Sequence, residues 1–129
     1  MKREFNNNKE EARKMVRTEI VKVYQMDSRA ARKLGIYKFF EWELEGEKIE
    51  QLGSPEEIIA AIYDRVYEAE KMVLENGEMH VADAIFNASN HGELKWSWTG
   101  HSMSVSDIVQ VGERYLFCDD YGWVELKEG

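Results

Sequence analysis

The chain is poor in cysteine and proline, and it has no long hydrophobic run. Cys118 is the only cysteine among 129 residues, which excludes an internal disulfide framework and is typical of proteins from a reducing compartment. No apolar run approaches the roughly 20 residues that cross a bilayer, so we expect no membrane contact. The polar N-terminal residues lack the apolar core of a signal peptide. Together these absences predict a cytoplasmic protein.

The sequence also lacks the residue spacings that hold metals and phosphates. Its three histidines are scattered, and they form no paired motif with one another or with Cys118. A Gly-rich phosphate loop is missing as well. Asp119-Asp120 lacks the remaining ligands of a calcium loop and is typical of a turn. We therefore expect no metal and no cofactor.

The composition predicts one globular domain. Hydrophobic residues make up 43% of the chain and charged residues 33%, and neither a repeat nor a low-complexity linker divides it. We place a flexible basic segment with a short helix at residues 1–17 and the folded domain at residues 18–129.

Charge is distributed unevenly along the chain. Residues 1–33 hold ten Lys/Arg and five Asp/Glu, a net charge of +5, whereas residues 34–129 hold seven and twenty, a net charge of −13. The acidic body would repel phosphate backbones, so we expect no direct nucleic-acid binding. The basic N-terminal third is either a solvated helix face with a tail or a surface for an anionic partner.

Short runs of β-branched and aromatic residues predict the strands. These runs lie at residues 18–26, 36–44, 107–111, 114–118 and 123–126. Between the first two, Asp27 offers an N-cap for a short helical turn that Gly35 ends. Gly112 suits the first central position of a type II′ hairpin between two of the last strands.

A long helix is expected over residues 54–76 and a shorter one over residues 79–86. Ser54, Pro55 and Glu57 form a capping box with proline at the first helical position. Apolar residues follow at helical spacing until Asn76-Gly77: Ile58, Ile62, Val66, Ala69 and Val73. We therefore predict a single α+β domain with an antiparallel sheet of about five strands, covered on one face by both helices.

The most concentrated polar motif follows Gly100. His101, Ser102, Ser104, Ser106 and Asp107 include every side-chain type of a nucleophilic triad. A triad, however, needs a base within hydrogen-bond reach of the hydroxyl and a third group that orients the base, which adjacency in sequence does not supply. The interpretation that we favour is a turn, in which the serine hydroxyls and Asp107 bond nearby backbone amides.

Two further patterns each leave two interpretations open. Trp96 and Trp98 share one side of an extended segment, and we expect at least one indole in the core, with a ligand-binding surface as the alternative. Glutamates at positions 41, 43, 45 and 47 alternate with apolar residues. They indicate a solvated strand face or, alternatively, an acidic surface that mimics DNA.

Several C-terminal stretches resemble the YodL-like domain family. The run Gly100–Val109, the pair of aromatic residues in Tyr115–Asp119 and the step Tyr121-Gly122-Trp123 are similar to the family's C-terminal motif, with Met103 in place of leucine and Trp123 in place of phenylalanine. Asp83–Asn87 and the early strand Val23–Met26 are similar to two further elements. The specific resemblance covers about residues 80–126.

The resemblance implies a bacterial protein of a mobile genetic element and brings no established reaction with it. We therefore expect a non-catalytic interaction domain with a protein partner. The alternatives are a small hydrolase that uses His101, Ser104 and Asp107, and an acidic DNA mimic. The candidate interaction residues are Gly100, His101, Ser102, Ser104, Ser106, Asp107, Trp96, Trp98, Tyr115, Asp119 and Gly122.

Overall fold

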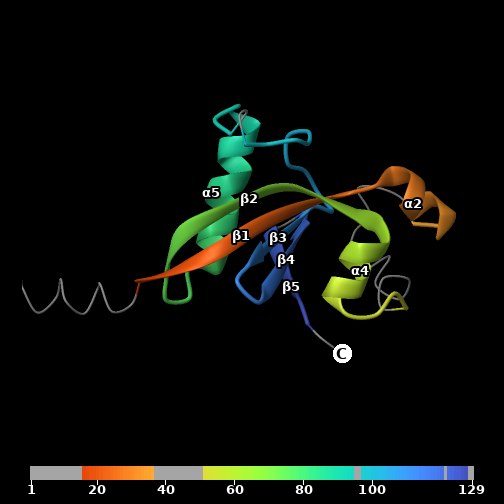
Figure 1. Ribbon diagram of the computed structural model, residues 1–129, viewed down its shortest axis with the longest axis horizontal. Helices are drawn as coiled ribbons and strands as arrows, with labels where there is room; N and C mark the ends of the chain where they lie inside the picture. The colour runs from red at the N-terminus through yellow and green to blue at the C-terminus, as the bar shows by residue number, and fades with distance from the viewer. Residues whose placement is uncertain (1–15, 37–50, 95–96, 121, 128–129) are drawn as a thin grey trace, which may run out of the picture.

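The computed structural model describes residues 16–36, 51–94, 97–120 and 122–127 (Figure 1). Within these ranges, five strands and three helices follow one another in the order β1, α2, α4, β2, α5, β3, β4 and β5. Their bounds are Val16–Met26, Ser28–Lys33, Pro55–Ile62, Tyr63–Leu74, Glu78–Asn90, Ile108–Val111, Arg114–Asp119 and Gly122–Leu126. The predicted α+β class and the five-stranded antiparallel sheet are confirmed.

The sheet has the strand order β2-β1-β3-β4-β5, and every neighbouring pair is antiparallel. β1 pairs with β2 along its whole length, from Val16 opposite Leu74 to Met26 opposite Tyr63, but it pairs with β3 only over Val21–Tyr24. The first half of β1 and the second half of β2 therefore form a two-stranded ribbon that extends past the other strands (Figure 1).

Helices cover both faces of the sheet, because successive side chains of a strand point to opposite sides. On one face Ile58 and Ile62 of α4 pack with Tyr24, Ile108 and Phe117. On the other face α5 packs over a second cluster, which includes Ala82, Ile85, Val21, Val23, Val109, Val111 and Leu116. The prediction that both helices lie on one face is therefore wrong.

The long helix predicted over residues 54–76 is not formed. Its first half is correct: the Ser54 hydroxyl accepts from the Glu57 amide at 3.3 Å, Pro55 begins α4, and the capping box is complete. The helix ends at Ile62, and the chain continues directly as β2. The helical spacing of apolar residues continues into a stretch that also alternates with a period of two, and pairing with β1 decides in favour of the strand.

The shorter helix is longer than predicted. α5 begins one residue before Met79 and continues past the predicted end at residue 86 to Asn90. Ser89 and Asn90 bond back to the carbonyl of Phe86 within the helix, at 3.0 and 2.8 Å, which satisfies these polar side chains without ending it.

Other local predictions fall into two groups. The Asp27 carboxylate caps α2, and Gly35 and Gly112 take positive φ values of 76° and 60°, as their predicted turns require. β1 begins at Val16, so it includes the last two residues of the segment predicted as N-terminal tail. Three predictions lie outside the described residues: the short helix before Val16, the strand at residues 36–44 with its glutamates (of which only Ile36 is described), and the position of Trp96.

Candidate functional site: the segment Ser97–Asp107

The segment Ser97–Asp107 leads from the α5 side of the molecule to β3, and it crosses β2 at a β-bulge (Figure 1). The β1–β2 register shifts from Val23 opposite Tyr67 to Tyr24 opposite Arg65, which leaves Val66 without a partner on β1. The Val66 carbonyl instead accepts from the Thr99 amide at 3.0 Å and from the Thr99 hydroxyl at 3.2 Å. The bulge therefore provides the first attachment point of the segment.

Gln25, the residue before the last one of β1, provides the second attachment point. Its amide nitrogen donates to the His101 carbonyl at 2.9 Å and to Oδ2 of Asp107 at 3.0 Å, while its amide oxygen accepts from the His101 amide at 3.1 Å. The Gln25 side chain is only 4% exposed, so these bonds form away from water. One carboxamide thus joins β1 to both ends of the motif.

Gly100 is required by the closeness of this contact. A Cβ atom at position 100 would lie 2.0 Å from Oε1 of Gln25 and 2.8 Å from a methyl carbon of Val66. Both distances are well inside van der Waals contact, and the Gln25 carboxamide cannot move away without breaking its bonds to His101 and Asp107. The glycine of the motif thus allows the backbone to lie directly on the β1–β2 pair.

Ser104–Asp107 forms a β-turn, as we predicted from the sequence. The Asp107 amide donates to the Ser104 carbonyl at 3.2 Å, and Ser106 has a φ of 79°, which matches the third position of a type II turn. Oδ2 of Asp107 also accepts from the Ser104 amide at 3.1 Å. The two hydroxyls differ from the prediction. That of Ser106 donates to the Val105 carbonyl and not to an amide, and in the described part of the chain Ser104 Oγ has no hydrogen bond. The turn is held mainly by the carboxylate.

The turn is also joined to the core beneath it. Ser106 and Asp107 are fully buried, and the Ser106 carbonyl accepts from the Tyr63 hydroxyl at 2.7 Å. Burial, together with the negative charge of Asp107, raises the pKa of Tyr63. The Ser106 amide donates to the Cys118 carbonyl, and the Cys118 amide donates to the Asp107 carbonyl, both at 2.8 Å. The turn thereby sets where β3 begins beside β4.

His101 is exposed, and its ring contacts the motif itself. Nδ1 lies 2.8 Å from the Ser102 carbonyl and 3.4 Å from the amide nitrogen of Gln25. In a hydrolase triad the carboxylate orients the imidazole through Nδ1. Here Nδ1 bonds a backbone carbonyl, and Oδ2 of Asp107 bonds Gln25 and Ser104. Both groups therefore bond the polypeptide that forms the motif.

The end of α5 holds the middle of the motif. Met103 is 3% exposed, its amide donates to the Ser89 hydroxyl at 3.2 Å, and its carbonyl accepts from Asn90 at 3.4 Å. Trp98 is partly buried: its indole nitrogen donates to the His101 carbonyl at 2.7 Å, and its ring packs on Tyr67 with 5.5 Å between centroids. We expected at least one indole in the core, and Trp98 is partly buried and packs against the cluster on the α5 face.

The structure does not bring the other candidate residues to this motif. Tyr115 is buried in the cluster on the α4 face, and its hydroxyl lies 3.4 Å from a carboxylate oxygen of Glu56. Asp119 and Gly122 pair at the β4–β5 connection, where Gly122 has a φ of 129°. Tyr115 therefore lies in the core beneath α4, and Asp119 and Gly122 lie where β4 turns into β5.

Sequence reasoning missed the residues on distant elements that hold the motif. Gln25 is the main one, and Tyr63 and Ser89 act beside it. A signal for Gln25 was present, since a glutamine between apolar strand residues needs a buried hydrogen-bond partner. Its partner is 76 residues away in the sequence, and no local pattern identifies it.

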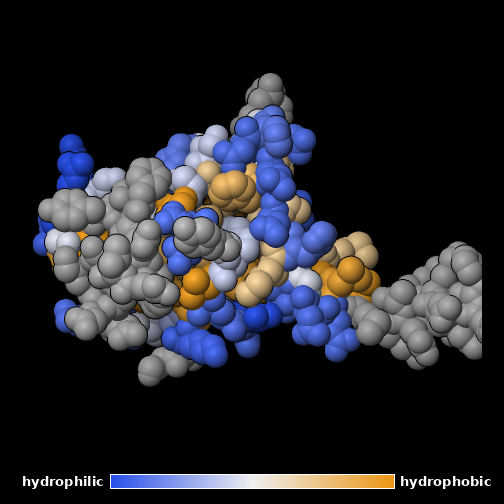
Figure 2. All heavy atoms as spheres, turned by 180° about the vertical axis from the view of Figure 1, so that it is seen from behind, coloured by the Kyte–Doolittle hydropathy of each residue, from blue (hydrophilic) through white to orange (hydrophobic). Residues whose placement is uncertain are grey.

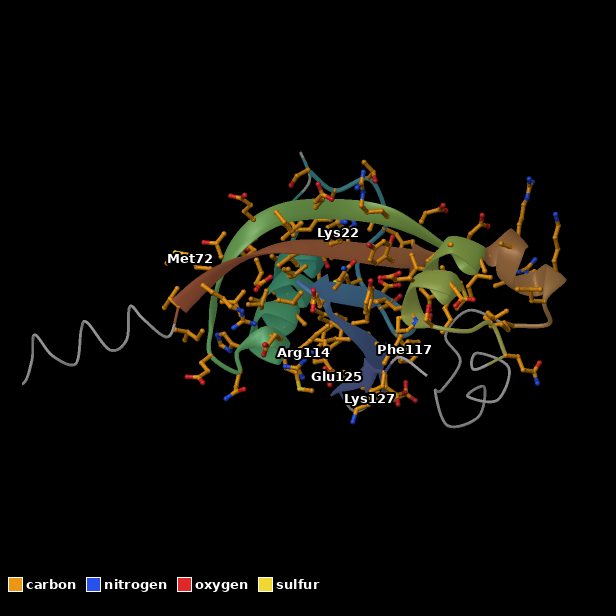
Figure 3. The ribbon with its side chains drawn as sticks, turned by 60° about the horizontal axis from the view of Figure 1, so that its bottom comes forward. Lys22, Met72, Arg114, Phe117, Glu125 and Lys127 are labelled. Atoms are coloured by element: carbon orange, nitrogen blue, oxygen red, sulfur yellow. The ribbon has the colours of Figure 1, made fainter. Side chains whose placement is uncertain are left out.

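A second polar cluster lies at the start of α5. Glu78 is 5% exposed and pairs with Arg17 of β1 at 2.6 Å and with Arg114 of β4 at 2.9 Å, and Arg114 also bonds Glu125 of β5 (Figure 3). Burial opposes ionisation of Glu78, but its backbone amide and the two guanidinium groups outweigh burial and hold its pKa below the usual value. The cluster attaches the helix to three strands of the sheet.

The surface of the described residues includes the following grooves. The first, of about 550 Å³, runs between the outer half of β2 and α5, and it is mostly apolar. Its lining residues are Lys71, Met72, His80, Val81, Ala84, Ile85, Ala88, Glu93 and Leu94. The second, of about 590 Å³, lies along β3–β5 and is lined mainly by charged side chains, and the third, of about 270 Å³, lies beside Trp98 and Ser102.

Neither a metal-binding cluster nor a known relative assigns a role to the described residues. The described ranges contain no group of three or more His, Cys, Asp or Glu side chains placed to hold a metal ion. Nor do they include a helix with the length and apolarity of a membrane span. No protein-family model, no curated protein and no solved structure matches this chain.

Proposed function

We propose that this chain is a non-catalytic interaction domain that binds a protein partner through the groove between β2 and α5. In keeping with the resemblance to YodL-like domains, the proposed setting is the cytoplasm of a bacterium that carries a mobile genetic element. The proposal assigns different roles to two parts of the molecule: the motif at Ser97–Asp107 stabilises the fold, and the groove binds the protein partner.

The polar groups of the motif support the first half of the proposal. The Gln25 amide, the Asp107 carboxylate and the backbone of His101 bond one another, and Gly100 lies against Gln25 and Val66. Groups used in this way hold a long connection in place without needing a substrate. We therefore assign the motif to structure.

The observation that carries the proposal is the groove itself. It combines a mostly apolar lining with the edge of β2, and Met72, one of its lining residues, is 74% exposed. Figure 2 shows apolar atoms at the surface of the outer end of the β1–β2 ribbon, where Ile20 and Leu74 are 43% and 58% exposed. Ile20 and Leu74 lie on the strand face away from α5, so the assignment rests on the lining of the groove, because apolar surface left open to water is typical of a binding site.

A peptide selection tests this assignment. A displayed library of random 12-residue peptides is selected in parallel on the unchanged protein and on the Ala84→Arg variant. Ala84 is exposed on α5 and lines the groove, so an arginine there obstructs the groove while it preserves helix propensity. We expect peptides that are enriched on the unchanged protein and lost on Ala84→Arg.

Asn87→Arg is the matched control. Asn87 is exposed on the same helix but does not line the groove, so the same new side chain should leave selection unchanged. Both variants should unfold at urea concentrations close to that of the unchanged protein. Peptides that are retained equally by Ala84→Arg, or a library without enrichment on the unchanged protein, would contradict the assignment.

A further inference from the structure

The outer edge of β2 offers hydrogen-bonding groups to an extended chain. Among the strands of the described residues, β2 lies at the edge of the sheet and has β1 as its one neighbour. In the described part of the chain, the only backbone bond to its outer side away from its ends is the one from Thr99 to Val66, so residues 68–73 have no backbone partner there. An extended polypeptide is the ligand whose N–H and C=O groups match such an edge.

The two faces of this edge differ in chemistry. On one face Glu68, Glu70 and Met72 lie opposite Lys22, Ile20 and Thr18 of β1, and Glu68 and Glu70 are exposed. On the other face Ala69 and Lys71 adjoin the apolar side chains of α5 that line the groove. A strand added to β2 would therefore meet carboxylates at alternate positions and the apolar groove at the positions between them.

Charge complementarity selects the side chains of such a strand. Opposite charges on directly facing residues of adjacent strands stabilise the pair, whereas like charges destabilise it. Glu68 is already near Lys22 and Arg65, at 3.8 and 3.0 Å, but these long side chains are 33% and 56% exposed. Glu70 has its aliphatic partner Ile20 across the strand pair and is open to a cation from the other side.

Resting on the proposed function, we infer that the groove binds an extended protein segment that adds as a strand to the edge of β2. Lysine or arginine side chains of that segment face Glu68 and Glu70, and the apolar side chains between them enter the groove beside α5. About six residues of the partner are enough to follow residues 68–73 at about 3.3 Å each.

The length and position of the outer ribbon support strand addition over a docked helix. β3 leaves β1 after four pairs, so the far end of the β1–β2 ribbon projects from the sheet and its edge is accessible (Figure 1). Figure 3 places Met72 at this projecting end, with its side chain directed away from the body. A helix has no free backbone groups along its length to satisfy those of residues 68–73.

The test uses a fluorescein-labelled synthetic peptide, Lys-Val-Lys-Leu-Lys-Val-Lys, with the full-length protein. Anisotropy gives the affinity, and amide hydrogen exchange shows where the peptide binds. We expect saturable binding below about 1 mM, together with slower exchange at residues 68–73. A peptide of the same composition with its apolar residues together, Lys-Lys-Val-Leu-Val-Lys-Lys, should bind more weakly because alternation is lost.

Charge reversal at one position separates strand addition from general attraction to an acidic protein. Glu70→Lys should weaken the alternating peptide about fivefold and strengthen its glutamate counterpart, Glu-Val-Glu-Leu-Glu-Val-Glu. Glu113→Lys makes the same change at the exposed β3–β4 turn and should alter both affinities less than about twofold.

Each remaining result overturns the inference. Equal affinity for both lysine peptides, equal loss in the two lysine variants, or binding without protection at residues 68–73 would each contradict strand addition. Self-association of the protein that Glu70→Lys changes would identify a second copy as the occupant. Selected peptides that need the groove but lack alternation would reject this inference and leave the interaction function standing, whereas a library without groove-dependent peptides would reject both.

Discussion

Replacing Gln25 with leucine should test whether the motif depends on one buried carboxamide. The substitution keeps the approximate volume but removes the donors to the His101 carbonyl and to Asp107, as well as the acceptor for the His101 amide. Two of these partners keep another bond, since Trp98 donates to the His101 carbonyl and the Ser104 amide donates to Asp107. The His101 amide loses the partner described for it.

The size of the effect follows from burial. Leaving a buried polar group unsatisfied costs about 1–3 kcal/mol, and more for a charged group, so we expect the free energy of unfolding to fall by about 2–4 kcal/mol. That is a large part of the roughly 5–15 kcal/mol by which domains are stable. With a typical slope for urea unfolding, the midpoint should shift by about 1–2 M.

The assay is urea unfolding followed by tryptophan fluorescence, together with hydrogen exchange at the Thr99 and His101 amides, which should become faster as the segment detaches. Gln110→Leu is the control, because Gln110 is a partly buried glutamine on β3 that bonds Tyr24 and Gly112 outside the motif. We expect it to cost about 1 kcal/mol. If Gln25→Leu costs no more than Gln110→Leu, or leaves exchange unchanged, the central role of Gln25 is refuted.

Three further outcomes are expected. Glu78→Gln should lower the free energy of unfolding by about 1–3 kcal/mol at pH 7. The pKa of Glu78 in the folded protein lies below the usual value, so the stability that its charge contributes is present above about pH 4.5 and is lost at lower pH. The urea midpoints of the two proteins should therefore converge on acidification. Convergence at alkaline pH instead would contradict the ion cluster. Burial, with nearby aspartates, raises the pKa of Cys118 to about 12, so at pH 8 a thiol reagent should react about 1,000-fold more slowly with the folded than with the urea-unfolded protein; labelling of the folded protein within mixing time would show the thiol to be accessible. His101→Ala should change stability by less than about 1 kcal/mol and leave the hydrolysis of p-nitrophenyl acetate at the background rate of the unchanged protein; turnover that disappears with His101 would revive the hydrolase hypothesis.

Local signals in the sequence were sufficient wherever partners are near in the chain. The capping box at Ser54 and Glu57 and the Asp27 cap each form within three residues, and the Gly112 turn joins adjacent strands. The Asp107 carboxylate likewise bonds an amide three residues back. Such contacts depend on backbone geometry that a few residues specify, so the sequence pattern predicts them.

Residues 63–74 show why local signals failed elsewhere. Alanine, glutamate, lysine, methionine and leucine favour a helix there, and apolar residues recur at helical spacing. The same stretch also carries Tyr63, Val66, Tyr67 and Val73, which suit a strand. Eleven register pairs with β1 outweigh the small differences in local propensity. The helix prediction was therefore wrong because its competitor lies about 50 residues away in the sequence.

The sequence by itself determined the class of the fold, the helix caps, the final three strands and the polar turn before them, because each depends on composition or on neighbours in the chain. Only the tertiary structure decided that β2 is a strand, that Val66 bulges, that Gln25 holds the motif and that an apolar groove opens beside β2 at the edge of the described sheet. Each of these features depends on contacts between segments that are far apart in the sequence, and the residues next to a position in the chain do not specify which distant segment it will contact.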